Sequence, residues 1–242
     1  MRIVVFDIWG DYAHFRKFYT TSSPLTFSFP PPPTISGILG AIYGTDKETN
    51  QYLDIFGPAN CKTAIRILNP VKKVRIGINL LESKGTNLRV PMSDKNLAPR
   101  TQIRTEFIKD PMYRIYATHT DDKVISVLGE KLFKHEPVFS VSLGLSELLA
   151  NFRFVGYFDY ETIADLKPVE LCSPFTAENL TSAGLEIEVG KKYFKERLPI
   201  LMDRNRVVGK YADVIFEPDG KPIKAKVFIY QKLETGENIA FF

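Results

Sequence analysis

The chain has 242 residues, of which 44% are hydrophobic, enough to bury the core of one large domain or of a main domain with a small addition. No apolar run approaches the ~20 residues of a membrane-spanning helix, and Asp7 interrupts the early apolar run, so we expect a cytoplasmic protein without signal peptide or membrane contact. Two distant cysteines and three scattered histidines give neither a disulfide framework nor a metal-ligand spacing, and we expect no metal or cofactor.

The basic residues are concentrated in one part of the chain. The formal net charge is +4, which by itself is a weak indication of an anionic partner. Residues 62–114, however, contain twelve Lys and Arg against four Asp and Glu, so this segment carries +8 and the remainder −4. A local cationic surface on an acidic body suits a phosphate backbone, whereas a solvated charged hairpin is the alternative without function.

Residues 2–9 are β-branched and aromatic with little alternation, which predicts a buried central strand. The loop that follows combines cations that can bind phosphates with rings that can stack on bases. The candidate RNA-binding residues of this loop are His14, Arg16, Lys17 and Tyr19. The alternative is that the rings of the loop belong to the core.

Four prolines, Pro30 to Pro33, predict an extended segment that no helix can include. We expect a helix after them, capped by Thr34 and ended by Gly44. Its apolar face is formed by residues spaced i, i+3, i+4 and i+7, namely Ile35, Ile38, Leu39 and Ile42.

The opposite face of this helix has only small residues, namely Gly37, Gly40, Ala41 and Gly44. Small residues permit close approach by another backbone, either of a protein or of a nucleic acid. Simple packing of the helix on a sheet is the alternative.

The next segments predict a short helix at 46–56 and then two strands, at 73–81 and 113–118, that pair with each other. Residues 83–100 would form a long basic excursion between these strands. A helix is expected over 121–135, followed by a strand at 138–141. The core stripe of that helix would be Val124, Val127, Leu128 and Leu132. This order predicts an α+β fold of the ferredoxin-like or RRM-like type.

The C-terminal part predicts strands at 211–216 and 223–230, joined as a hairpin by a turn at 217–221. We therefore expect two units: an RRM-like RNA-binding domain at 1–165 and a β-rich subdomain at 166–242.

Several motifs, in order along the chain, resemble one protein family. They are RIVVFDIWG at 2–10, the segment from AHFRKF to GAIYG at 13–44, SLGLSELLA at 142–150, and LPILMDRNRVVGKYADVIFEPDGKPI at 198–223. Together they resemble the Cas-five proteins, the CRISPR RNA-binding subunits of type I Cascade complexes, and are closest to type I-B. The resemblance covers essentially the whole chain.

The resemblance implies a subunit that binds and caps the 5′ handle of CRISPR RNA and docks the large subunit and a backbone subunit of Cascade, with target DNA also present in the complex. It implies a thumb hairpin inserted at about 83–104, a loop at the handle containing Ser142 and Gly144, and a small C-terminal β subdomain. Cations in or beside the thumb would bind phosphates without reading sequence, namely Arg75, Arg89, Lys95, Arg100 and Arg104.

Catalysis is the rival interpretation. In the type I-C branch of this family a tyrosine, a lysine and a histidine cut precursor CRISPR RNA. Tyr43 stands at the tyrosine-like position, but Tyr116 stands where a lysine is expected and His119 is displaced by one residue. We therefore expect a non-catalytic protein in which Tyr43 either is structural or packs against RNA. The alternatives are a metal-independent endoribonuclease using Tyr43 and His119, and an interaction scaffold that binds no RNA.

Overall fold

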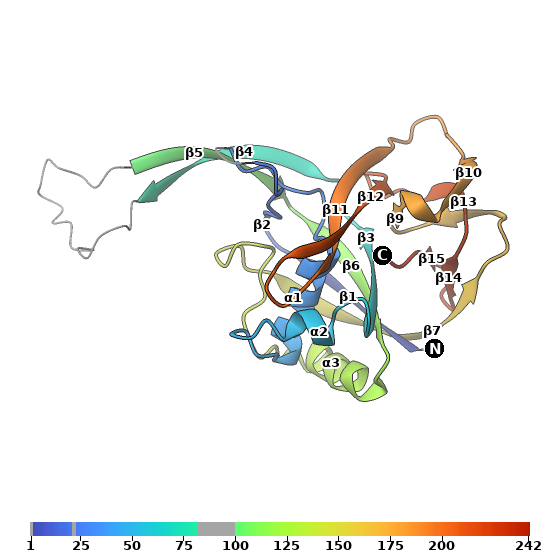
Figure 1. Cartoon of the computed structure of the whole chain (residues 1–242), viewed down its shortest axis with the longest axis horizontal. Helices are drawn as coiled ribbons and strands as arrows, with labels where there is room; N and C mark the ends of the chain where they lie inside the picture. The colour runs from blue at the N-terminus through green and yellow to red at the C-terminus, as the bar shows by residue number, and fades with distance from the viewer. Residues whose placement is uncertain (1, 21–22, 82–99) are drawn as a thin grey trace, which may run out of the picture.

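The computed structural model describes residues 2–20, 23–81 and 100–242, and within them it is a sheet-dominated α+β protein (Figure 1). Its centre is a six-stranded sheet of order β15-β14-β7-β1-β6-β3, in which all neighbours are antiparallel. The strands are β1 (Arg2–Trp9), β3 (Cys61–Ile67), β6 (Met112–His119), β7 (Asn151–Ile163), β14 (Tyr230–Leu233) and β15 (Asn238–Ile239). The expected α+β class is confirmed.

The predicted strand at 2–9 is confirmed as β1, which lies between β6 and β7. It is buried on both faces, which explains why its sequence scarcely alternates. Val4 and Phe6 belong to the main core beneath the helices, while Ile3 and Val5 belong to a second cluster on the other face.

The second face of the sheet also contains buried charge. Asp7 is 0% exposed, and its carboxylate accepts from Arg114 Nε at 2.7 Å and from Arg153 Nη2 at 3.0 Å. Hydrogen bonding to Asp7 raises the pKa of Arg114 despite partial burial. Glu237 pairs with Arg66 and lies 3.6 Å from Arg114. These arginines of the sheet are therefore neutralised by the protein's own carboxylates.

Helix α1 (Pro32–Tyr43) begins three residues earlier than predicted. Pro31 is its N-cap and no side chain caps it, so the assignment of Thr34 as the cap was wrong. Prolines fit the first turn because their missing N–H groups would have no partner there. The apolar stripe is confirmed, since Ile35, Ile38, Leu39 and Ile42 are all buried. Gly44 ends the helix in the left-handed conformation, as expected.

The small-residue face of α1 is occupied by the chain itself. A Cβ added at Gly40 would lie 2.6 Å from the Cβ of Tyr52, which belongs to helix α2 (Tyr52–Ile55). Val138 packs in the same way against Gly44. On this face the helix therefore packs inside the protein, but against α2 and Val138 and not on a sheet as the alternative interpretation had it. The short helix expected at 46–56 is reduced to α2, because residues 47–50 form turns.

Helix α3 (Asp122–Lys134) is confirmed, with the Asp121 side chain accepting from Lys123 N at 2.9 Å. Leu128 and Leu132 of the predicted stripe are buried and Val124 packs partly against the core, but Val127 is 39% exposed and Ile125 is buried in its place.

The strand predicted at 138–141 is not a strand. Val138 N and Phe139 N instead donate to the carbonyls of Ile42 and Ala41, at the end of α1. The strand that follows α3 is β7, which starts at Asn151.

The hairpin predicted from strands 73–81 and 113–118 was wrong in its pairing. β4 (Lys72–Leu81) pairs along its length with β5 (Arg100–Lys109), whereas β6 lies inside the sheet between β1 and β3. The short β2 (Tyr12–Ala13) adds to β5 near the body. Strands β4 and β5, hereafter the arm, project from the body (Figure 1).

The C-terminal part contributes two three-stranded sheets, β10-β13-β8 and β11-β12-β9. Their elements are β8 (Pro168–Leu171), β9 (Phe175–Thr176), the 3-10 helix η1 (Ala177–Asn179), β10 (Leu180–Leu185), β11 (Phe194–Met202), β12 (Val208–Phe216) and β13 (Ile223–Val227).

The turn at 217–221 is present but does not close a hairpin, because β12 and β13 belong to different sheets. The buried carboxylate of Glu217 fixes it by accepting from the backbone N–H groups of Asp219 and Lys221. The strand expected to run to Tyr230 ends at Val227, and Tyr230 begins β14 beside β7. The C-terminal part thus completes the main sheet.

None of the helices in the described parts of the chain is long and apolar enough to span a membrane.

Candidate nucleic-acid interface

Two segments that the sequence marked separately lie against each other. His14 N donates to Leu143 O at 3.0 Å, which joins the loop after β2 to the 142–146 loop. Gly144 has φ +104°, and a Cβ there would lie 1.9 Å from the carbonyl oxygen of His14. Only glycine fits this position without displacement of the backbone. The glycine therefore permits close approach of the protein's own chain.

His14 is 3% exposed, and its side chain is part of the interior. Its Nδ1 is hydrogen-bonded to Glu106 O at 2.7 Å, and its ring lies 5.5 Å from that of Phe107 on β5. The contact fastens the loop to the base of the arm.

Lys17 is held by the protein. Its Nζ donates to Glu196 Oε1 at 3.1 Å, and its side chain is only 12% exposed. Burial disfavours the charged ammonium, but Glu196 more than offsets this, so the pKa of Lys17 is raised. Glu196 also accepts from Ser28 N at 3.0 Å and lies 3.5 Å from Lys73 Nζ. One carboxylate of β11 therefore holds the loop and the arm together.

Arg16 and Tyr19, in the same loop, face solvent. The guanidinium of Arg16 donates to Thr20 O at 3.3 Å, and no ion pair engages it in the described part of the chain. Tyr19 is 59% exposed and packs edge-on against Phe18. Of the four candidates in this loop, these two present their functional groups to a ligand.

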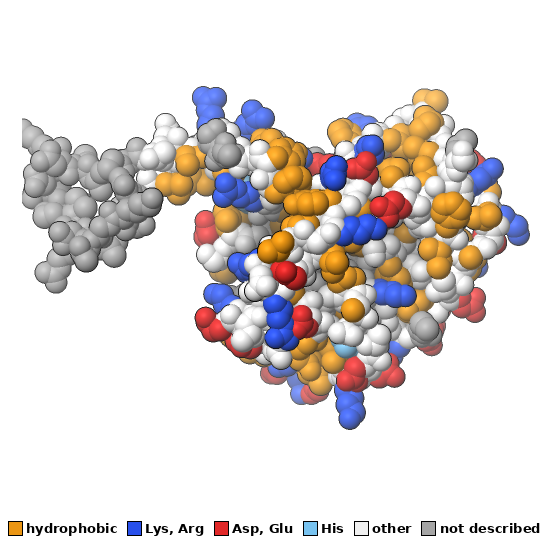
Figure 2. Space-filling model, viewed as in Figure 1, with side chains coloured by type: hydrophobic (Ala, Val, Ile, Leu, Met, Phe, Trp, Pro, Cys, Tyr) orange, Lys and Arg blue, Asp and Glu red, His pale blue; other side chains and the backbone are white. Residues whose placement is uncertain are grey.

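The arm has one basic and one apolar face. On the basic face the cross-strand pairs are Arg75 with Glu106, Gly77 with Arg104 and Asn79 with Gln102. On the other face they are Ile76 with Thr105, Ile78 with Ile103 and Leu80 with Thr101. Figure 2 shows Lys and Arg side chains and hydrophobic side chains next to each other on the arm where it leaves the body.

The cations of the arm remain accessible. Arg75 has a 68% exposed side chain and lies 3.8 Å from Glu106, while Arg104 is exposed. Arg100 begins β5. Arg89 and Lys95, which the sequence placed in the thumb, lie outside the described residues.

The other candidates occupy packed positions. Ser142 is half-buried in a β-bridge with Leu149. Tyr43 is half-buried, with its ring 5.6 Å from that of Phe56. His119 Nε2 is bonded to Ile55 O at 2.8 Å, and its Nδ1 accepts from Asp121 N at 2.9 Å. Both ring nitrogens of His119 are thus already engaged by the backbone.

Sequence reasoning missed the acidic side chains that hold the basic ones. Glu196 lies 179 residues from Lys17 along the chain, and no local pattern indicates such a contact. It also missed Tyr211 on β12, whose ring centroid lies 4.7 Å from that of Phe18. Both belong to the C-terminal part, which the sequence had marked only as β-rich.

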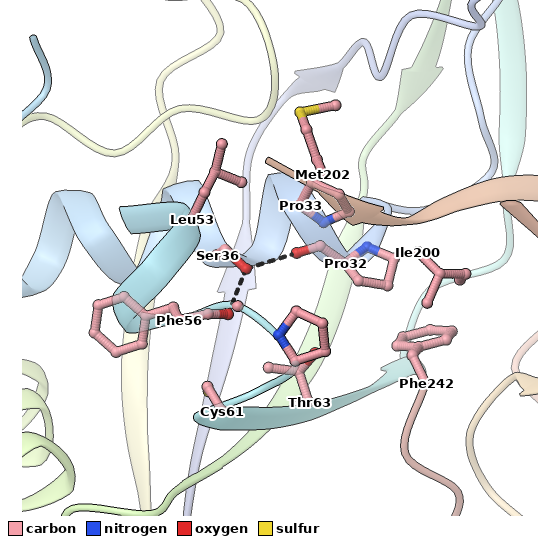
Figure 3. Close-up of a pocket in the computed structure, with 12 residues that line it drawn as sticks. Pro32, Pro33, Ser36, Leu53, Phe56, Cys61, Thr63, Ile200, Met202 and Phe242 are labelled. Atoms are coloured by element: carbon pink, nitrogen blue, oxygen red, sulfur yellow. Dashed lines mark hydrogen bonds between the residues drawn. The ribbon is translucent and has the colours of Figure 1, made fainter. Parts of the chain in front are cut away.

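A small hollow is present in the described structure. Figure 3 shows this hollow beside the start of α1, where Ser36 Oγ donates to Phe56 O at 2.6 Å. Its volume of about 20 Å³ has room for roughly one water molecule. Burial raises the pKa of the Cys61 thiol, which lines it, to about 12. The described residues contain no group of three or more His, Cys, Asp or Glu that could hold a metal ion.

Comparison with protein families identifies the chain. The family model described as "CRISPR-associated protein (Cas_Cas5)" matches residues 3–165, which is more than half of the sequence. The chain belongs to the CRISPR-associated Cas5 family. This is the Cas-five family that the sequence motifs resemble.

Solved structures share the Cas5 chain's fold at low sequence identity. A CRISPR protein from Archaeoglobus fulgidus has a TM-score of 0.57 at 14% identity, covering 99% of this chain and 98% of its own. A chain of a "CRISPR RNA-guided surveillance complex" has a TM-score of 0.54 at 9% identity, covering 92% and 91%. A structure described only as a Cas protein has a TM-score of 0.50 at 11% identity, covering 93% and 95%. No curated protein matches the sequence.

Proposed function

We propose that this Cas5 chain is a non-catalytic subunit of a type I Cascade complex that binds and caps the 5′ handle of CRISPR RNA. Family membership supports the assignment to CRISPR systems, and the similarity to a chain of an RNA-guided surveillance complex supports an assembled complex. The observation that carries the proposal is the projecting two-stranded arm with one basic and one apolar face. The narrower assignment to type I-B depends on the sequence resemblance alone.

The body is proposed to be ferredoxin-like or RRM-like. The order β7-β1-β6-β3, with α1 between β1 and β3 and α3 between β6 and β7, supports this topology. The arm supports the expectation of a thumb inserted in this body. We retain 1–165 and 166–242 as the two proposed units, with β14 of the second unit packed against β7 of the first.

The basic face of the arm is proposed to bind the phosphates of the RNA. Arg75 and Arg104 are accessible there. Arg16 lies near the base of the arm, where it forms an isolated β-bridge with Thr26. Such contacts position a strand without reading its bases and weaken as salt rises. The apolar face would then pack on a neighbouring subunit, because an isolated two-stranded hairpin is marginally stable in water.

The surroundings of Tyr43 and His119 favour binding of RNA without catalysis. The ring of Phe56 lies 5.6 Å from that of Tyr43 and 6.1 Å from that of His119, and so packs against both. A general base must have a free nitrogen within reach of the substrate hydroxyl, and both nitrogens of His119 are engaged by the backbone.

The test is filter binding of the purified full chain to handle-containing RNA and to a scrambled RNA, over a range of salt and with a chelator present. We expect a preference for the handle, and a salt slope that becomes less steep by about 1.4 when Arg75 and Arg104 are both changed to Gln, since each phosphate contact in a single strand contributes about 0.7. Lys134→Gln with Lys167→Gln, on α3 and in the loop after β7, is the matched control for charge.

Two outcomes would overturn the proposal. Specific cleavage of the RNA in chelator, lost on His119→Ala, would establish the endoribonuclease alternative. Absence of handle preference together with absence of a salt slope would favour a protein scaffold that binds no RNA.

A further inference from the structure

Three aromatic side chains gather on the surface where the loop after β2 meets the β11–β12 hairpin. Phe18 is 54% exposed and Tyr19 59% exposed, and their ring centroids lie 5.1 Å apart at right angles. Phe18 also lies 4.7 Å from Tyr211, a half-buried residue of β12. The cluster is therefore built from two segments that are far apart in sequence and belong to different parts of the fold.

The hairpin presents Tyr211 on its outer face. Ala212 and Val214, its alternating neighbours on β12, are buried, so Tyr211 points the other way. It is paired across the strands with Pro199, and Leu201 further along is 42% exposed. The outer face of the hairpin thus extends the aromatic cluster with apolar surface.

An exposed cation, Arg197, accompanies these rings. The guanidinium carbon of Arg197 lies 5.7 Å from the centre of the Tyr211 ring. Its cross-strand neighbour, Asp213, is paired with Lys195 at 3.1 Å. No ion pair engages Arg197 in the described part of the chain, and the residue is exposed. Arginine beside an exposed ring is suited to hold a phosphate while the adjacent base stacks.

The loop does not need these rings to stay attached to the hairpin. The ion pair of Lys17 with Glu196 and the hydrogen bond from Ser28 N to Glu196 Oε2 at 3.0 Å already fix it. Phe18 and Tyr19 nevertheless remain more than half exposed to water. Large exposed rings gathered beside a cation are typical of surfaces that bind a ligand.

We propose that Phe18, Tyr19 and Tyr211, together with Arg197, form a stacking site for unpaired bases of single-stranded RNA. The inference rests on the proposed RNA-binding function and extends it to the β11–β12 hairpin. Glu196 connects the two surfaces, since it contacts Lys17 of the loop and Lys73 of the arm. A strand bound along the arm would therefore meet the rings where the arm joins the body.

The test compares a handle-length RNA with an abasic strand of the same length, using the full chain. The variants are Phe18→Leu and Tyr211→Leu, which keep apolar volume and remove the rings. We expect each to lower the preference for the base-bearing strand by at least about fivefold, the lower limit for loss of one stacked base. Binding of the abasic strand should be unchanged. Phe133→Leu, at a 74% exposed ring on α3, is the control and should have no effect.

The result separates this inference from the proposed function. A wild-type chain that binds both strands equally, with a salt slope, would overturn the stacking site and leave the phosphate surface in place. A wild-type chain that binds neither strand would overturn both. A DNA strand of the same sequence is the third probe, and a ring-dependent preference for DNA over RNA would overturn the assignment to RNA.

Discussion

The basic residues of the sheet body and of the arm differ in their partners and in their exposure to solvent. In the body, the side chain of Arg114 is only 23% exposed and is hydrogen-bonded to Asp7, which is 0% exposed, so its charge is used within the protein. On the arm, Arg75 has a 68% exposed side chain and Arg104 is exposed. Arg75, Arg104 and Arg114 all belong to the basic segment at 62–114. The comparison teaches that the number of basic residues in a sequence overstates the charge available to a ligand.

At the junction between the body and the arm, the lysines are partly exposed and are paired with carboxylates. Lys73, at the start of the arm, lies 3.7 Å from Glu106 and 3.5 Å from Glu196. Lys17 is similarly held by Glu196. Since their carboxylate partners are already present, these lysines stabilise the junction and have little charge left for RNA. Of the described cations further along the arm, Arg75 lies 3.8 Å from Glu106 but has a 68% exposed side chain, and Arg104 is exposed, which makes the two roles separable by mutation.

The largest expected effect is on the body. Asp7→Ala should lower the free energy of unfolding by about 3 kcal/mol, because it leaves two guanidinium groups without their main partner. This is the low end for a broken buried pair, since Arg153 is 66% exposed and Arg114 keeps Glu237. Chemical denaturation would measure it. Asp213→Ala, which removes an exposed pair with Lys195, should cost under about 1 kcal/mol. Equal losses of unfolding free energy in the two variants would contradict the distinction between the buried and the exposed carboxylate.

The next effect concerns the contact between the two loops. Gly144→Ala should destabilise the protein by about 2 kcal/mol, because the residue has φ +104° and the added Cβ would meet the His14 carbonyl. Gly190→Ala is the control, since Gly190 also has a positive φ but has open space around it. Thermal unfolding of both variants distinguishes backbone strain alone from strain plus a clash. A smaller loss of stability for Gly144→Ala than for Gly190→Ala would contradict the close contact between Gly144 and the His14 carbonyl.

Alkaline pH provides a third comparison. Burial raises the pKa of Tyr113 and of Tyr116 above the ordinary value near 10. Above pH 10 the unfolded chain therefore loses these protons while the folded chain retains them, so stability present below pH 10 falls as pH rises. The slope should be about 1.4 kcal/mol per pH unit for each tyrosine. Denaturation at pH 9 to 11 would measure it, and Tyr113→Phe should make the decline less steep.

The smallest expected effect on stability comes from the arm. Changing both Arg75 and Arg104 to Gln should alter the free energy of unfolding by less than about 0.5 kcal/mol, because both side chains are exposed. The same variant should bind RNA more weakly and with the reduced salt slope described above. A large loss of stability in this variant would show that these arginines are structural, and would remove the distinction between arm and body.

Local pattern was sufficient for the elements that depend on near neighbours. The apolar run at 2–9 predicted β1, and the spacing of Ile35, Ile38, Leu39 and Ile42 predicted the buried face of α1. Gly44 and Asp121 marked the helix ends correctly, because caps are satisfied by groups within a few residues. The family motifs also gave the correct family, which the match over residues 3–165 establishes.

Strand partners required the tertiary structure. The alternation in 73–81 and in 113–118 was real, but an alternating strand does not indicate which strand lies beside it. β5 was overlooked because its residues, RTQIRTEFIK, mix basic, threonine and apolar residues without a clear core face. Only the base of β5 is buried, at Thr105, Phe107 and Ile108, so most of the arm has no buried face to create such a pattern. The pairing of β4 with β5 was thus decided by the burial of β6 between β1 and β3.

The candidate site likewise consists of residues that the sequence identified and of contacts that only the fold showed. Sequence alone located the basic segment and the loop with Arg16 and Tyr19, since residue type determines what a side chain can bind. It did not reveal that His14 is buried, or that Lys17 is paired with a carboxylate 179 residues away. Nor did it indicate that Tyr211 lies against Phe18. Burial and pairing depend on contacts between distant segments, and only the folded chain determines which cations and rings remain available to a ligand.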